Sequence, residues 1–470
     1  MAPPEYIPDE PLTPSGRLFL EPRMNTIIHC VLGVKNKMDV EAVKTTIKNS
    51  ELLKQPRFCS LLVHDKNGFE YWRRTEVDMD KHIIVVDDKV NSSENEHEDV
   101  EKIVNDYIAD LSVSSPLSSD KPLWELHVMV EKKCSIFRIH HALGDGISLM
   151  SLLMASCRTE EDPEAKPTLV AGGGGRRRGG GKGLGNVLWR SNFIMEVLKA
   201  VFFSVVFCLE FVLRCLWVCD RKTVISGGDG VEQWPRTVVT AKFLVEDMKA
   251  VKNAVANATI NDVLFGVISA GLSKYLNHRS PNSLREGQQL TGLAMVNLRQ
   301  QPELQDLTGK TKGNSGSKWG NKFGMFLLPS YYYKGLEPLE YVKRAQPMTN
   351  RKKNSLEAHF SYLIGDLIMH WLGPKFACML NYRIVCNTTF TISNVIGPKE
   401  EITIAGNPIT YIRVNTTSLP HALTMHMVSY AGKADMQILV AKDLIHDPEF
   451  LAKCFEESLV EMKNAAQETI

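Results

Sequence analysis

The segment His140–Gly146 (His-His-Ala-Leu-Gly-Asp-Gly) joins two apolar runs and places two histidines and one carboxylate between them. The run before it, Cys134–Ile139, has the composition of a buried strand, and the run after it, Ile147–Ala155, that of a buried helix. A short loop with two glycines therefore connects a strand to a helix, which favours a fold of mixed α and β layers. Loops at such junctions are held by a rigid scaffold and commonly border a cleft.

A histidine in this loop indicates a general base, because histidine has the side-chain pKa nearest neutrality. Such a base removes a proton from a hydroxyl, amine or thiol that attacks a carbonyl, which contributes about 10² to 10⁴ in rate. Asp145 could accept the other ring N–H or pair with a distant arginine. Gly144 and Gly146 suit unusual backbone angles or the close approach of a substrate. The alternative is a purely structural turn, in which the ring nitrogens of both histidines are hydrogen-bonded within the protein.

Further short motifs follow one another along the chain in a fixed order. They are Pro11–Pro14, Pro122–Trp124, Asn261–Asp262, Val296–Arg299, Trp319–Asn321 and Ser393–Pro398. The loop matches HHxxxDG, a signature of acyltransferases similar to chloramphenicol acetyltransferase and of peptide-condensing domains. With the added motifs the chain resembles the plant-type wax ester synthase/diacylglycerol acyltransferase family, from about residue 8 to about residue 465.

The resemblance implies an α/β fold with α+β layers, of the two-lobed CoA-dependent acyltransferase type, with the active site between the lobes. It implies that His141 is the proton acceptor and that His140, Asp145 and Gly146 support the loop. The donor would be acyl-CoA, and the acceptor a long-chain alcohol or diacylglycerol. The resemblance also implies a reaction without a covalent enzyme intermediate and without a metal. Acyl-CoA is a substrate of this reaction, so no cofactor is expected.

Composition shifts divide the chain into four parts. We predict an amino-terminal lobe over residues 1–165, a flexible Gly/Arg linker over 166–192, an apolar helix over 193–218, and a carboxy-terminal lobe over 235–470. Strand-like and helix-like runs alternate in both predicted lobes, as in Thr26–Val34 and Asp39–Asn49. In the second lobe, Thr259 can cap a helix that follows it. The linker is mostly glycine with Arg176, Arg177, Arg178 and Lys182, a composition that cannot form a core.

The apolar run 193–218 indicates contact with membrane lipids. Its uncharged centre, Ala200–Leu209, is about half the length that spans a bilayer. A full span would also place the two lobes on opposite sides of the membrane. We therefore favour a helix in one leaflet, with a full span and a core helix as alternatives. The neighbouring basic cluster suits anionic headgroups. The expected location is the endoplasmic reticulum membrane, with the lobes facing the cytosol, and the cell membrane is a further expected location.

The charge balance, the cysteines and the first residues argue against a nucleic-acid-binding, disulfide-rich, zinc-binding or secreted protein. A net charge of +1 over 470 residues gives no reason to expect a nucleic-acid partner. The ten cysteines form no CxxC pair, which favours buried thiols in a reducing compartment over a disulfide framework or a zinc site. The first 16 residues contain five prolines and no apolar core, so we expect no signal peptide.

Four polar residues at the ends of apolar strands are candidates for substrate binding: Asn297, Arg299, Ser393 and Asn394. One of them could donate to the oxyanion that forms when a thioester carbonyl is attacked. Turn-forming and strand-capping roles are the alternative. Arg299 could instead pair with Asp145 and so join the lobes.

Three rival functions are open at this point. A soluble acyltransferase of specialised metabolism would carry a DFGWG motif, which the chain lacks. A peptide-condensing domain shares HHxxxDG, but the chain has no carrier module. A catalytically inactive lipid-binding membrane protein is the third rival, against which the intact loop argues.

Overall fold

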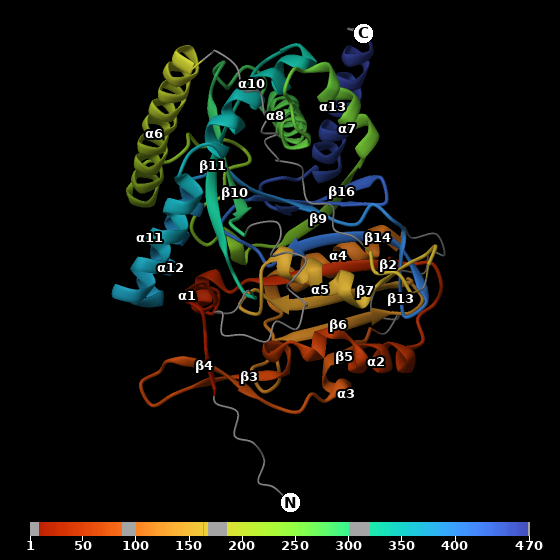
Figure 1. The fold of residues 1–470 in the computed structure, drawn as a ribbon. Helices are drawn as coiled ribbons and strands as arrows, with labels where there is room; N and C mark the ends of the chain where they lie inside the picture. Colours follow the sequence, from red (N-terminus) through yellow and green to blue (C-terminus); the bar gives the residue numbers. More distant parts are fainter. Residues whose placement is uncertain (1–8, 87–99, 163, 168–185, 300–318, 469–470) are drawn as a thin grey trace, which may run out of the picture.

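The protein consists of two lobes, each a mixed β-sheet covered by helices, one above the other in Figure 1. The computed structural model describes residues 9–86, 100–162, 164–167, 186–299 and 319–468. The lower lobe in Figure 1 contains the HHxxxDG loop, and the upper lobe is built from the second half of the chain. This arrangement is the predicted two-lobed α/β class.

The first lobe is built on a seven-stranded sheet in the order β5-β6-β7-β2-β14-β13-β8. Its neighbours pair antiparallel except β5 and β6. The strands are β2 (Ile27–Val34), β5 (Ile83–Val85), β6 (Trp124–Met129), β7 (Cys134–His140), β8 (Arg158–Thr159), β13 (Ile402–Ile404) and β14 (Asn407–Thr416). Its helices are α1 (Pro14–Leu18), α2 (Val40–Asn49), α3 (Met79–His82), α4 (Val100–Ser114) and α5 (Gly146–Ser156), and a small sheet holds β1 (Glu10–Pro11), β4 (Glu70–Arg74) and β3 (Ser60–His64).

The second lobe is built on a six-stranded sheet in the order β11-β10-β12-β15-β16-β9. The strands are β9 (Arg236–Leu244), β10 (Gln289–Asn297), β11 (Phe323–Tyr331), β12 (Phe390–Ile396), β15 (Leu423–Tyr430) and β16 (Lys433–Ala441). The helices are α7 (Val245–Ala254), α8 (Ile260–Arg279), α10 (Pro338–Lys353), α11 (Glu357–Trp371), α12 (Gly373–Cys386) and α13 (Pro448–Glu468). Thr259 caps α8 in a reciprocal capping box with Asp262, and the predicted cap at Thr259 is therefore confirmed.

The carboxy-terminal half of the chain also contributes to the first sheet. β14 pairs antiparallel with β2, and β13 pairs with β8. The chain therefore returns to the first lobe after building most of the second, which the predicted boundary of 235–470 for one lobe does not capture. The sheet whose strand β7 leads into the HHxxxDG loop therefore contains strands from both halves of the chain.

The apolar run forms α6 (Asn186–Leu216), which lies along one edge of the molecule in Figure 1. The helix begins within the predicted linker 166–192 and ends before residue 218. α6 contacts α11 and α12. Within the described ranges, no helix has both the length and the apolarity that crossing a membrane requires. All ten cysteines are free; Cys134 is buried, but Cys219 is exposed, so not every thiol is buried as predicted.

Candidate active site

The HHxxxDG loop connects the end of β7 to the start of α5. His140 is the last residue of β7, where it pairs with Ile27 of β2. Asp145 caps α5, and its carboxylate accepts a hydrogen bond from the backbone N–H of Ser148 at 3.0 Å. A carboxylate at this position accepts a hydrogen bond from an otherwise unpaired N–H of the first helical turn, and its negative charge interacts favourably with the positive end of the helix dipole. The loop therefore has the predicted strand-to-helix geometry.

Both ring nitrogens of His140 have hydrogen-bond partners. Its Nδ1 accepts from the backbone N–H of Ala142 at 3.2 Å, and its Nε2 lies 3.0 Å from Oδ1 of Asn25. An amide oxygen can only accept, so Nε2 carries the proton. Burial lowers the pKa of His140 to about 3, and repulsion from His141 acts in the same direction. His140 is thus a neutral residue that ties the loop to the segment before β2.

Among the described residues, His141 has a hydrogen-bond partner at one of its ring nitrogens. Its Nδ1 lies 3.2 Å from Oδ1 of Asn321, while Nδ2 of Asn321 donates to the backbone oxygen of His141 at 2.8 Å. Because Oδ1 can only accept, Nδ1 carries the proton and Nε2 keeps its lone pair. The Phe19 ring stacks on the imidazole with 4.1 Å between centroids, and the Phe323 ring lies 6.0 Å away. Burial lowers the pKa of His141, although the charge of Asp145 opposes that shift.

Asp145 and Arg299 form a buried ion pair that joins the two lobes. The Arg299 guanidinium donates to the Asp145 carboxylate and to the backbone oxygen of Gly320. The Lys322 backbone N–H also donates to Asp145, at 3.1 Å. Asp145 was expected either to accept a ring N–H of histidine or to pair with a distant arginine, and the structure shows the pairing with arginine.

The two loop glycines differ in their surroundings. A Cβ on Gly144 would lie 3.3 Å from the Trp319 indole, whose N–H donates to the backbone oxygen of Leu143 at 2.7 Å. A Cβ on Gly146 would meet Val395 at an ordinary 3.6 Å. Neither glycine has a positive φ, so the expectation of unusual backbone angles is wrong. Close packing against Trp319 favours glycine at position 144.

The remaining predicted polar residues lie at different places. Oδ1 of Asn297 accepts from the Arg299 backbone N–H at 3.0 Å, so it orients the residue that holds Asp145. Ser393 lies opposite His426 in the register of β12 and β15. The Asn394 side chain donates to Asn261 at 2.8 Å in an exposed contact. A role for any of them as oxyanion donor stays a prediction.

Three residues of the site were not assigned a role from the sequence. Asn321 fixes the proton of His141, and Phe19 covers its ring. His426 on β15 is buried, its pKa is lowered to about 4 by burial and by repulsion from His141, and its Nδ1 has no hydrogen-bond partner among the described residues. The Trp319–Asn321 motif was the available signal for Asn321. Phe19 and His426 stand in no motif.

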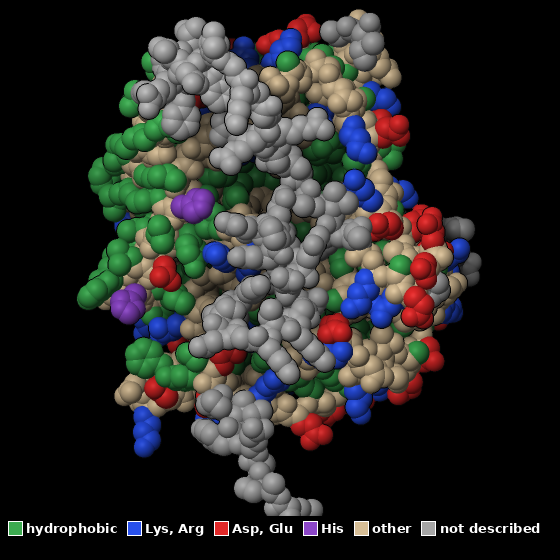
Figure 2. All heavy atoms as spheres, viewed as in Figure 1, with side chains coloured by type: hydrophobic (Ala, Val, Ile, Leu, Met, Phe, Trp, Pro, Cys, Tyr) green, Lys and Arg blue, Asp and Glu red, His purple; other side chains and the backbone are tan. Residues whose placement is uncertain are grey.

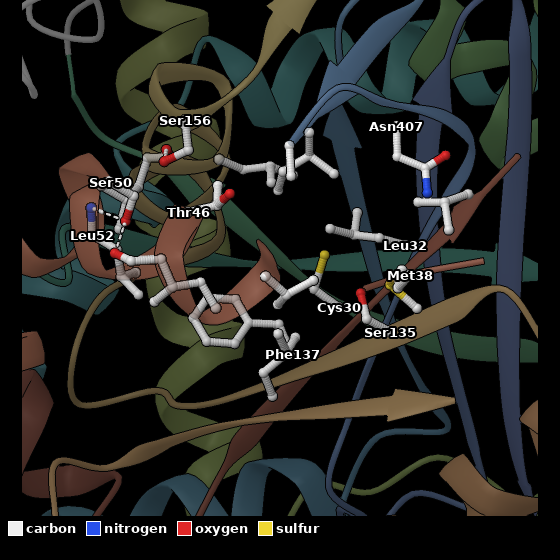
Figure 3. Close-up of a pocket in the computed structure, with 18 of the residues that line it drawn as sticks. Cys30, Leu32, Met38, Thr46, Ser50, Leu52, Ser135, Phe137, Ser156 and Asn407 are labelled. Carbon is white, nitrogen blue, oxygen red and sulfur yellow. Dashed lines mark hydrogen bonds between the residues drawn. The ribbon is translucent and has the colours of Figure 1, made fainter. Parts of the chain in front are cut away.

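An apolar cavity of about 370 Å³ begins beside the loop and extends through the first lobe. Gly146, Leu149, Leu153 and Ser156 line it along α5. Cys30 and Leu32 of β2 and Phe137 of β7 form its floor, with Thr46 of α2 on the opposite side (Figure 3). Its mainly apolar lining, which extends along α5 from Gly146 to Ser156, suits an extended apolar chain.

Comparison with known families identifies the chain. Residues 33–264 match the wax ester synthase/diacylglycerol acyltransferase catalytic domain, and residues 319–463 match the WS/DGAT C-terminal domain. The chain belongs to this family. Wax ester synthase/diacylglycerol acyltransferase 11 of Arabidopsis thaliana is 36% identical over 478 residues, covering 99% of this chain and 96% of that protein. This WS/DGAT protein is thus an acyltransferase, as predicted.

Solved structures agree with the fold of this WS/DGAT chain. The wax ester synthase/diacylglycerol acyltransferase from Marinobacter aquaeolei VT8 has a TM-score of 0.57 at 16% identity, covering 97% of this chain and 100% of that chain. A starter condensation domain of rhizomide synthetase in complex with C8-CoA has a TM-score of 0.54 at 12% identity, covering 98% and 95%. These likenesses confirm the two-lobed fold.

Proposed function

We propose that this acyltransferase moves an acyl group from acyl-CoA to the hydroxyl of a long-chain fatty alcohol or of diacylglycerol, with His141 as general base. The observation that carries the proposal is the hydrogen bond between Nδ1 of His141 and Asn321. It leaves the Nε2 lone pair free at the junction of the two lobes. A free alcohol is a poor nucleophile, so a positioned base of this kind is what the reaction requires.

The reaction needs no covalent enzyme intermediate. Nε2 of His141 takes the hydroxyl proton as the hydroxyl oxygen attacks the thioester carbonyl, which forms the new C–O bond. The tetrahedral intermediate then expels the CoA thiolate as the C–S bond breaks, and the proton on Nε2 passes to the sulfur. The products are an ester and free CoA, and His141 returns to its neutral form. Burial favours that neutral form, because it disfavours the charged imidazolium.

The cavity along α5 supports a long acyl donor. It starts at Gly146 beside the loop and is lined mainly by apolar side chains. The structural likeness to a condensation domain in complex with C8-CoA supports a CoA thioester as the donor. We assign this cavity to the acyl chain.

We further propose that the protein works at the endoplasmic reticulum membrane, with both lobes facing the cytosol. β8 precedes α6 and pairs with β13, which follows it, so the chain on both sides of α6 meets in one sheet. α6 exposes apolar side chains such as Phe202 and Val205. The Arg176–Lys182 cluster in the sequence adds attraction to anionic headgroups. Extraction of membranes tests this, since release of the protein by high salt alone would contradict insertion of α6.

Purified protein with radiolabelled palmitoyl-CoA, offered hexadecanol and diacylglycerol in separate reactions, tests the activity. We expect labelled ester with at least one acceptor, and a loss of about 10² to 10⁴ in turnover for His141→Ala. His446→Ala, at an exposed histidine, is the matched control and should retain activity. No ester with either acceptor, or more than about a tenth of wild-type turnover in His141→Ala, would contradict the proposal.

A further inference from the structure

Three helices turn apolar side chains away from the protein on one side of the molecule. Leu198, Phe202 and Val205 of α6 and Leu363, Leu367 and Trp371 of α11 are each between 50% and 74% exposed. α12 continues this surface, which we call the apolar face, with Phe376 and Met379. Figure 2 shows hydrophobic side chains along the edge of the molecule where α6, α11 and α12 lie in Figure 1. Contiguous apolar surfaces of this kind mark contact sites.

The charged residues in the last turns of α6 point inward, the reverse of a surface helix in water. Arg214 is buried, where it pairs with Glu210 at 3.2 Å and with Asp220 at 2.9 Å. Ser204 accepts a hydrogen bond from the Leu356 backbone N–H at 3.0 Å. Ion pairs and hydrogen bonds therefore hold the second half of α6 against the protein. An exposed ion pair between Lys199 and Glu196, at 3.1 Å, lies nearer the start of the helix. A helix built this way suits an apolar surrounding on its outer side.

The edge of the apolar face favours a lipid bilayer as its occupant. Trp371 is exposed at the end of α11, and tryptophan is enriched where membranes meet water. Arg383 continues the row of Phe376 and Met379 on α12 and is exposed, so its cation can reach headgroups while its stem lies along apolar surface.

A second cavity, of about 260 Å³, lies beneath this face. Val212 of α6, Gly365 of α11 and Leu380 of α12 are among its lining residues, and all three helices of the apolar face therefore border it. Asp366 and Asn381 also line it and provide hydrogen-bond acceptors for a hydroxyl group in mainly apolar walls.

The inner end of this cavity approaches His141. Phe323 and Leu18 line the cavity, and the Phe323 ring lies 6.0 Å from the His141 ring. Phe19, which follows Leu18, stacks on His141 and lies 5.9 Å from Phe323. Phe19 and Phe323 thus stand between the cavity and the base, on the side of His141 next to α1 and α11.

We propose that this second cavity is the acceptor channel: a neutral lipid alcohol dissolved in the bilayer passes between α6, α11 and α12 and reaches His141 past Phe323. The proposal rests on the proposed function and assigns the acceptor a route separate from that of the acyl chain. A sparingly soluble alcohol then reaches the base without crossing water. The acyl chain occupies the cavity along α5, and the two substrates meet at Nε2 of His141.

Filling the channel tests this route. Apart from its chain neighbours and the nearby backbone of its own helix, no atom of the described residues lies within 4 Å of the position that a Cβ on Gly365 would take. Gly365→Leu therefore adds bulk to the cavity without a clash at Cβ. Replacing a glycine inside a helix also favours the helix. We expect kcat/KM for hexadecanol to fall at least about tenfold, with a smaller loss for a short alcohol and an unchanged KM for palmitoyl-CoA. Gly365→Ala, which leaves most of the cavity open, is the control.

The outcomes separate the route from the activity. If the wild-type protein forms no ester with any alcohol, the proposed function fails. If it forms esters and Gly365→Leu retains its kcat/KM for hexadecanol, the channel proposal is overturned and the function stands. An equal loss for short and long alcohols would also overturn the channel, because it would indicate general damage to the site.

Flotation with phosphatidylcholine vesicles containing an anionic phospholipid tests the occupant of the apolar face. We expect the wild-type protein to float with the vesicles and the double variant Leu367→Glu/Trp371→Glu to float at least about fivefold less. Val460→Glu, at a residue 53% exposed on α13, is the matched control and should float like the wild type. A wild-type protein that forms dimers through this face and does not bind vesicles would overturn the proposal.

Discussion

Oδ1 of Asn321 accepts a hydrogen bond from the Nδ1–H of His141, although 180 residues separate the two in the chain. The same amide donates to the His141 backbone oxygen, so one side chain fixes both the ring and the loop. Asn321 lies in the short segment before β11 of the second lobe. The tautomer of the base in the first lobe therefore depends on the packing of the second lobe against it.

Removing this contact should impair the reaction more than the fold. In Asn321→Ala the imidazole loses the hydrogen-bond acceptor that keeps the proton on Nδ1. We expect turnover to fall by about tenfold to a hundredfold, which is less than the loss expected when the base itself is removed. Steady-state kinetics with radiolabelled acyl-CoA measures this. Asn354→Ala, which removes an exposed amide contact at the end of α10, is the control. Wild-type turnover in Asn321→Ala would show that Asn321 does not orient the base.

The pH dependence should report the lowered pKa of His141. A general base acts only while neutral, and activity is lost as the pH falls through its pKa. Since burial lowers that pKa, the acid limb of kcat/KM should lie below about pH 6.5, the value of a free histidine. In Asn321→Asp a carboxylate next to Nδ1 favours the imidazolium, so the acid limb should move to higher pH. An unmoved limb in Asn321→Asp would indicate that another group limits the rate.

The ion pair between Asp145 and Arg299 should contribute to stability as well as to loop position. Both side chains are buried, so Arg299→Met leaves the Asp145 charge without its partner, and we expect a loss of about 3–5 kcal/mol in the free energy of unfolding. Asp145→Ala should likewise reduce soluble yield. Thermal unfolding measures the effect, and the double variant should lose less than the sum of the single variants.

An exposed pair gives the comparison for this measurement. Lys343 and Glu340 form an ion pair one turn apart on the outer side of α10. Lys343→Met should leave the unfolding temperature nearly unchanged, because exposed pairs contribute little. If Arg299→Met were as stable as Lys343→Met, the pair would not hold the lobes together.

Local parts of the structure could be predicted from the sequence. Cys134–Ile139 and Ile147–Ala155 were placed within one residue of β7 and α5 at each end, because a buried strand and a buried helix flank a short loop. Thr259 was correctly placed as a cap because capping depends on a few neighbouring residues. The start of α6 at Asn186 was missed, since the glycine-rich composition before it indicated a linker.

Contacts between distant segments could not be predicted in this way. The return of β14 to β2 depends on pairing across most of the chain. The Arg299 pair with Asp145 stayed one alternative of several, because no local pattern selects a partner 154 residues away. Phe19 and His426 could not be predicted for the same reason, because their roles depend on packing against His141 and no local pattern indicates that packing.

The cavity along α5 should act as a ruler for the acyl chain. Gly146, Leu149, Leu153 and Ser156 line it at successive turns, and the helix rises about 1.5 Å per residue, so Ser156 lies roughly 15 Å along the axis from the loop. In Ser156→Phe the ring should block only the far end of a long chain. We expect kcat/KM for palmitoyl-CoA to fall about tenfold and that for octanoyl-CoA to change less than about twofold.

The inner position on the same helix provides the matched comparison. Leu149 is one turn from the loop, so Leu149→Trp should reduce kcat/KM for both donors, because even a short acyl chain passes it. A donor series from short to long acyl-CoA at saturating hexadecanol measures both variants. If Ser156→Phe reduced activity equally with every donor, or changed the preference for the alcohol instead, this cavity would not hold the acyl chain, and the assignment of the two substrates to their cavities would have to be reversed.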